Sequence, residues 1–189
     1  MKHSQVKLFA FAIAFLSLAA FAEDTSEPQK VPPFTLEDQH EKSHAFDFPR
    51  DKPLVFSIAD PGGAKDAPIW TDTIKEKYGD RIEFWSIANL SFIPELGRAP
   101  ARVGIRAISK DTVLCDWDGS VSASMKAEKG RANIVVVSDS GENLHVAFGK
   151  VEEKKLAKVY AAIDLILERL DAKEADPPDA APAENATIE

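Results

Sequence analysis

The sequence predicts an α/β fold, a three-layer sandwich with a mixed central β-sheet, over residues 32–170. Strand-like apolar runs alternate with helical segments in the first part of this region, which favours parallel strands. Two strand-like runs then flank the turn S-D-S-G-E at 138–142, which is typical of an antiparallel hairpin, and a long amphipathic helix follows. Parallel and antiparallel pairs together make the expected sheet mixed.

Several segments have the composition of strands. Short stretches at 34–36 and 44–48 flank the polar turn E-D-Q-H-E-K-S and predict a small hairpin or an extended lead-in. The run L-V-F-S-I-A at 54–59 is almost continuously apolar, as in a strand that is buried on both faces. Further strands are predicted at 82–88, 113–115, 134–137 and 144–148.

The first helix is predicted between an Asp66 cap and Gly79, with Pro68 in its first turn. One side of this helix would carry Ile69, Thr73, Ile74 and Lys77. The segment 94–108 is ambiguous: Val103, Ile105 and Ile108 favour a short helix, whereas Gly97, Pro100 and Gly104 weaken it.

The clearest helix is predicted at 151–170, where apolar residues recur at helical spacing. They are Leu156, Val159, Tyr160, Ile163, Ile166, Leu167 and Leu170.

The two ends of the chain differ from this core. Residues 1–22 have the parts of a secretory signal: Lys2 and Lys7, an apolar run at 8–18, and the small-residue site A-F-A at 20–22. Cleavage is favoured over retention as a membrane helix, because the apolar run is too short to span a bilayer. We therefore expect a periplasmic or secreted protein without stable membrane insertion, with a flexible lead-in at 23–31 and a disordered acidic tail at 171–189.

The net charge and the cysteine count exclude some classes of partner and of chemistry. Loss of the signal moves the formal net charge from −8 to about −10. Such a charge argues against nucleic acid and anionic membranes as partners. Cys115 is the one cysteine, so no internal disulfide can form.

Four stretches carry a resemblance to a known family. They are P-P-F-T-L-E-D at 32–38, P-L-V-F-S-I-A at 53–59, D-W-D-G at 116–119 and N-I-V-V-V-S-D-S-G-E at 133–142. Together they resemble the thioredoxin-like superfamily, in particular its redoxin branch of exported thioredoxins and peroxiredoxins. The resemblance implies a W-C-x-x-C site in the turn after the first core strand, where a helix N-terminus lowers the thiol pKa.

This chain has no cysteine at the positions of that site. The two cysteine positions of the family fall near Gly62 and Lys65, and Pro61 occupies the position of the tryptophan. The cis-proline position of the family falls near Asn133. No cysteine lies in 61–70, so a peroxidatic thiol is absent from this turn as well.

These residues lead to a first hypothesis: an exported, redox-inactive module, protein-binding or structural, without a cofactor. Its binding face would comprise Pro61, Gly62, Gly63, Lys65 and Asn133. Two other interpretations stay open for the glycines, a sharp turn with a close helix approach, or exposed amides that bind an anion. The segment 62–65 matches neither common phosphate-binding motif.

A second hypothesis is an enzyme. His40-Glu41-Lys42-Ser43-His44 spells H-E-x-x-H, which binds zinc when a helix places both imidazoles on one face. The polar neighbours and Pro49 favour a solvated turn instead, and a third ligand, such as His145, has no supporting spacing.

Cys115 is the other candidate, as the thiol of an oxidoreductase or peroxidase. It ends the apolar triplet V-L-C, which favours a buried structural residue. The neighbouring Asp116 and Asp118 would raise its pKa, which disfavours a nucleophile.

Overall fold

The structure is a computed structural model that describes residues 29–175. Its sheet contains β1 (Phe34–Asp38), β2 (Ser43–Phe46), β3 (Leu54–Ala59), β4 (Glu83–Asn89), β5 (Val113–Asp116), β6 (Asn133–Val137) and β7 (Asn143–Phe148). The order in this seven-stranded sheet is β2-β1-β5-β4-β3-β6-β7. β4 pairs in parallel with β3 and β5, and the other neighbours are antiparallel, which confirms the mixed sheet and both predicted hairpins.

Four α-helices accompany the sheet in the described residues: α1 (Ala67–Tyr78), α2 (Arg98–Ile108), α3 (Ser120–Ser124) and α4 (Glu153–Ala175). Short 3-10 turns occupy Gly79–Arg81 and Glu95–Gly97. α3 was not predicted, because a helix of one turn gives no periodic pattern.

The ends of the domain differ from the predicted boundaries. α4 continues to Ala175, so residues 171–175, which the sequence assigned to the tail, are helical. At the other end, the buried Val31 donates its amide to the carbonyl of Gly141 at 2.8 Å, so the last residue of the expected flexible lead-in is fixed to the domain. The predicted signal at 1–22 and the tail beyond Ala175 lie outside the described residues.

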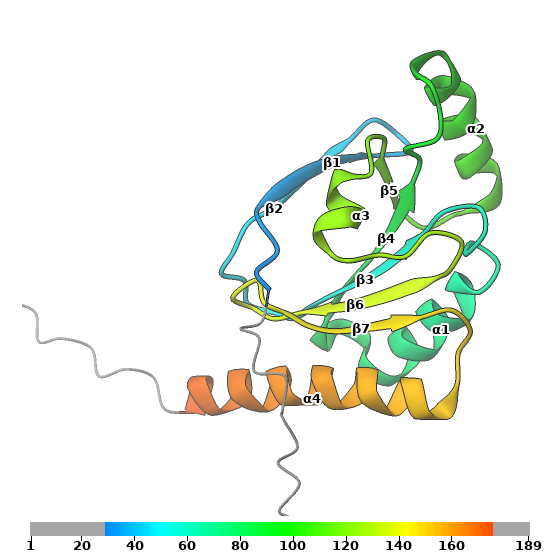
Figure 1. The fold of residues 1–189 in the computed structure, drawn as a ribbon. Coiled ribbons are helices and arrows are strands. Elements are labelled where there is room, and N and C mark those ends of the chain that lie inside the picture. The colour runs from blue at the N-terminus through cyan, green and yellow to red at the C-terminus, as the bar shows by residue number, and fades with distance from the viewer. Residues whose placement is uncertain (1–28, 176–189) are drawn as a thin grey trace, which may run out of the picture.

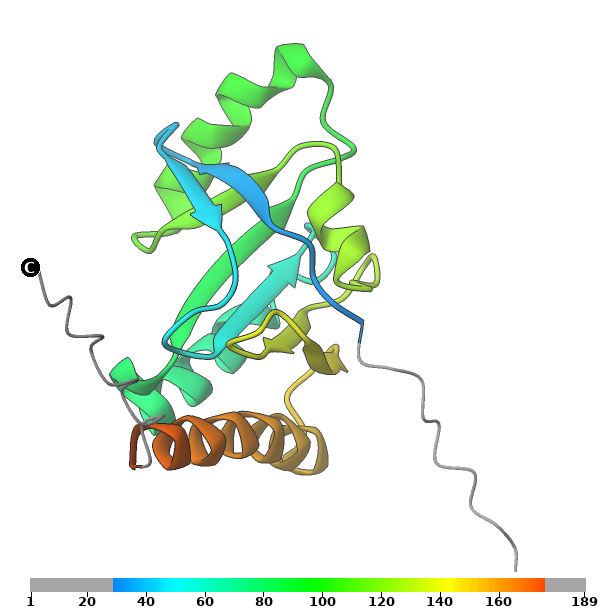
Figure 2. The same cartoon turned by 90° about the vertical axis from the view of Figure 1, so that its left-hand side faces the viewer.

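One face of the sheet is covered by α1 and α4, which lie together on the lower side in Figure 1. The predicted apolar stripe of α4 packs here, with Val159, Ile163, Ile166 and Leu167 buried over β6 and β7. The opposite face is covered by α3 and by the β1–β2 hairpin, whose Phe46 packs on Phe56. α2 and α4 lie at opposite ends of the molecule in both views (Figures 1 and 2).

The buried side of α1 is not the one that the sequence suggested. Trp70, Ile74 and Tyr78 are buried, whereas Ile69 is exposed. The two aromatic residues add hydrogen bonds to their apolar contacts: the indole of Trp70 donates to the carbonyl of Gly149 at 2.7 Å, and the hydroxyl of Tyr78 donates to Asp164 at 2.8 Å. These contacts fix the rotation of α1. Gly79 ends the helix as predicted, but Asp66 makes no side-chain capping bond.

The ambiguous segment 94–108 forms the 3-10 turn Glu95–Gly97 and then α2, which is attached by arginines rather than by an apolar stripe. Arg102 is buried and donates to the main-chain carbonyl of Asp38 and, at 2.5 Å, to the carboxylate of Glu37. Arg106 donates to the carbonyl of Gln39 at 2.6 Å. α2 is therefore tied to the β1–β2 turn, while Val103 and Ile108 are exposed.

Candidate functional site

The turn between β3 and α1 is organised by the carboxylate of Asp60. One carboxylate oxygen accepts from the amides of Gly62 and Gly63 at 3.0 and 3.1 Å. The other accepts from the amide of Gly130 at 2.8 Å, and the main-chain carbonyl of Asp60 accepts from Ala64 at 2.9 Å. The carboxylate thus occupies the position in which these amides could have bound an external anion. This geometry argues against the anion-binding interpretation of the turn.

Gly62 and Gly63 lie against the loop before β6, which leaves no room for a side chain at position 63. A Cβ on Gly63 would overlap the carbonyl of Arg131 and the amide nitrogen of Ala132, both of which are main chain. A Cβ on Gly62 would lie 2.8 Å from the Cα of Gly130. The glycines therefore permit close approach of this loop, as the turn interpretation held, and no side chain fits at position 63 without a backbone shift.

Asn133 is not available to a partner, contrary to its assignment to the binding face. The residue is 1% exposed. Its side-chain nitrogen lies within hydrogen-bond distance of the carbonyls of Ile58, Glu128 and Arg131, and its side-chain oxygen accepts from the amide of Glu128 at 2.7 Å. All of its polar atoms are satisfied internally, so Asn133 ties β6 to Ile58 of β3 and closes the loop before β6.

Pro61 and Lys65 remain exposed on the same turn. Beside them is a hollow of about 280 Å³ between this turn and the loop after β4. Its lining residues include Asp60, Pro61, Gly62, Asn89, Phe92 and Lys129. Phe92 is 59% exposed, which is unusual for a large aromatic side chain. Phe92 and Lys129 were not among the predicted site residues. The position of Phe92 just after a predicted strand was a usable signal, because loops at strand ends often form sites.

Cys115 is buried in β5, separated from β3 by β4 in the sheet order. The residue is 1% exposed. Burial raises the pKa of its thiol, Arg102 lowers it, and Asp38 and Glu37 raise it, which together place the pKa at about 11. The predicted increase is confirmed, but burial is its main cause, not Asp116 and Asp118. A protonated, inaccessible thiol cannot act as a nucleophile at neutral pH, so the Cys115 enzyme hypothesis loses its support.

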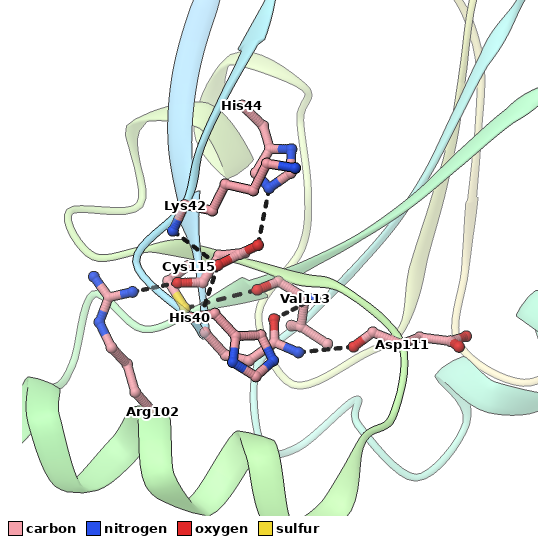
Figure 3. Close-up of polar contacts among 9 residues, drawn as sticks. His40, Lys42, His44, Arg102, Asp111, Val113 and Cys115 are labelled. Carbon is pink, nitrogen blue, oxygen red and sulfur yellow. Dashed lines mark hydrogen bonds and ion pairs between the residues drawn. The ribbon is translucent and has the colours of Figure 1, made fainter.

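The H-E-x-x-H residues lie on a hairpin, not on a helix. His40 and Glu41 are in the β1–β2 turn, Glu41 has φ +67°, and His44 is on β2. The imidazole of His44 is instead bonded to Asp38, with 2.9 Å between His44 Nε2 and the carboxylate. Figure 3 shows the two imidazoles well apart, so they do not converge on one metal position. Within residues 29–175 no group of three or more His, Cys, Asp or Glu could hold a metal ion. The hairpin geometry of the motif gives the zinc hydrolase alternative no support.

Asp38 is the centre of a polar network that the sequence did not indicate. Its carboxylate accepts from the amides of His40 and Lys42 at 2.7 and 3.0 Å, besides its bond to His44 (Figure 3). Burial raises the pKa of Asp38, but the hydrogen bonds from His44, Lys42 and His40 outweigh that effect and leave the pKa below its ordinary value. The network stabilises the turn to which α2 is attached.

Searches for related proteins found likeness in fold only. No protein-family model matches the chain, and no curated protein matches it by sequence. Among solved structures, the exposed lipoprotein thioredoxin Etrx1 of Streptococcus pneumoniae aligns with a TM-score of 0.54 at 13% identity, over 69% of this chain and 98% of the other. Peroxidoxin BcpB of Mycobacterium tuberculosis aligns at 0.50 and 19% identity, over 74% and 96%. A thioredoxin-like superfamily protein aligns at 0.53 and 14% identity, over 74% and 96%.

The chain therefore has a thioredoxin-like fold, as its motifs predicted, and its one cysteine is buried in β5, two strands from β3. None of the helices in the described part of the chain is long and apolar enough to cross a membrane.

Proposed function

We propose that the protein is an exported thioredoxin-like domain that performs no thiol–disulfide exchange and binds another protein through the hollow beside the β3–α1 turn. The observation that carries this proposal is the carboxylate of Asp60, which binds the amides of Gly62, Gly63 and Gly130. A side chain of the protein itself thus fills the place where the resemblance implies redox chemistry.

Two features support a protein as the ligand of the hollow. Phe92 is a large exposed aromatic side chain, a residue type enriched at protein interfaces. Pro61 and Lys129 border it and add a rigid apolar surface and a positive charge. The protein as a whole is acidic, so we expect the partner to present an apolar side chain next to a carboxylate.

Export is supported by the sequence of residues 1–22 and by one structural neighbour whose name describes it as an exposed lipoprotein. This chain has no cysteine at the cleavage point, so we expect a free mature protein rather than a lipid-anchored one. N-terminal sequencing of the protein from the extracytoplasmic fraction should begin at Glu23. An intact N-terminus in the membrane fraction would contradict this expectation.

Redox inactivity is tested with the purified mature protein. We expect no reduction of insulin disulfides and no peroxide turnover with a thiol donor, because Cys115 is buried and protonated. Activity that disappears in Cys115→Ser would overturn the proposal.

The binding surface is tested by photo-crosslinking in the producing cells, with p-benzoylphenylalanine in place of Phe92. We expect a covalent adduct with a different protein, identified by mass spectrometry. The matched control places the same amino acid at Leu165, an exposed apolar position on α4. Equal adducts at both positions, or none at Phe92, would contradict binding at this hollow.

A further inference from the structure

A larger groove lies between α1 and α2, with a volume of about 380 Å³. Its floor is made of small side chains on β3 and β4, namely Ser57, Ala59, Ser86 and Ala88. Ile105 and Ile108 of α2 line one wall, and Pro68 and Thr71 of α1 line the other. Because the floor residues are short, the two helices cannot fill the space above them.

The attachment of α2 explains why the groove stays open. Arg102 and Arg106 hold the helix to the carbonyls of Asp38 and Gln39, so its position does not depend on apolar packing over the sheet. As a result Ile108 is 86% exposed at the rim of the groove. Ile108 extends the apolar surface of the groove, and contiguous exposed apolar patches often mark interaction sites.

Asp72 and Lys110, one exposed side chain on each wall, carry opposite charges. Asp72 lines the groove from α1, and Lys110 lines it just after α2. Neither makes an ion pair among residues 29–175, whereas the adjacent Lys75 and Asp111 are already paired at 3.0 Å. With Asp72 on one wall, Lys110 on the other and a protruding Ile108, the groove can pair with a second copy of itself after a two-fold rotation.

We propose that the occupant of this groove is a second copy of the same chain. In the resulting symmetric dimer, Ile108 of each protomer enters the groove of the other, and Asp72 of each protomer pairs with Lys110 of the other. Because the contact is isologous, each favourable interaction occurs twice. The groove shares no lining residue with the hollow at Phe92, so the variants that test the dimer leave the proposed protein-binding residues unchanged.

Sedimentation equilibrium on the mature protein tests the dimer. We expect a reversible monomer–dimer equilibrium at micromolar concentrations and a dissociation constant raised at least about tenfold in Ile108→Glu, which would place two charges in an apolar groove. The matched control is Leu165→Glu, at an apolar residue that is 62% exposed on α4, at the opposite end of the molecule (Figures 1 and 2). We expect this variant to dimerise like the wild type. Circular dichroism verifies that both variants are folded.

Charge reversal tests the pairing itself. Asp72→Lys and Lys110→Asp should each weaken the dimer roughly threefold to tenfold, and the double variant should restore it. Both side chains are exposed, so folding should be unaffected. A monomer at several hundred micromolar, a dimer that tolerates Ile108→Glu, or a double variant no better than the single ones would overturn the proposal.

Discussion

The carboxylate of Asp60 accepts a hydrogen bond from the amide of Gly130 at 2.8 Å, although the two residues are 70 positions apart. The same carboxylate binds the two glycine amides before α1. One side chain thus holds the β3–α1 turn against the loop before β6, at the position where the resemblance places the redox site of the family.

Loss of this carboxylate should destabilise the domain. We expect Asp60→Ala to lower the free energy of unfolding by about 1.5–3 kcal/mol, because three amides lose a charged acceptor. Urea denaturation followed by circular dichroism measures this effect. Asp66→Ala is the control, since Asp66 makes no capping bond and should cost less than about 1 kcal/mol. Equal losses in the two variants would contradict the assigned role of Asp60.

Substitutions of glycine should follow the space around each residue. Gly63→Ala should cost several kcal/mol or prevent folding, because the new Cβ meets the main chain of Arg131 and Ala132. Gly104→Ala should instead stabilise the protein by roughly 0.5–1 kcal/mol, because Gly104 lies inside α2 with nothing within 4 Å of the Cβ position. Thermal unfolding of both variants tests this ranking, and a tolerated Gly63→Ala would refute the close approach of the loop.

Cys115 should be inert in the folded protein. We expect a thiol reagent such as 5,5′-dithiobis(2-nitrobenzoic acid) to label it only after denaturation, because the side chain is buried. The folded-state pKa of about 11 lies above the ordinary value of 9.0. Folding therefore favours the protonated thiol, and its contribution to stability is present below pH 9 and lost as the pH rises toward 11. Cys115→Ser should flatten the stability profile in that window, and rapid native labelling would contradict the burial.

Asp38 should make the stability of the domain depend on pH in the acid range, whereas Cys115 does so in the alkaline range. Its pKa is below the ordinary value of 3.8, so its stabilising effect is present above that value and disappears as the pH falls through the folded-state pKa. We expect Asp38→Asn to lower the free energy of unfolding at pH 7 and to reduce its dependence on acid. His44→Ala should reproduce part of this change, because the hydrogen bonds from His40 and Lys42 remain. Urea titrations between pH 7 and pH 2.5 measure both effects.

The strongest patterns in the sequence predicted their elements correctly. The run at 54–59 forms β3, and the stripe of Leu156, Val159, Ile163 and Leu167 packs α4 on the sheet. These predictions succeed because periodicity reflects which side of an element is buried.

Elements fixed by distant polar contacts were harder to predict. The rotation of α1 depends on Gly149 and Asp164, which bind Trp70 and Tyr78 from the other end of the chain. The position of α2 depends on the hydrogen bond from Arg102 to the main-chain carbonyl of Asp38. Every residue has such a carbonyl, so the sequence does not indicate which one accepts the bond.

The sequence by itself determined the absence of sulfur near α1, the acidic charge, the alternation of strands and helices, and the non-helical setting of the H-E-x-x-H residues. Only the tertiary structure decided that Asp60 fills the turn, that Asn133 is buried and that a groove remains between α1 and α2. The physical reason is that these features depend on main-chain atoms and on packing between residues far apart in the chain. The local amino-acid composition does not indicate which distant residues come together.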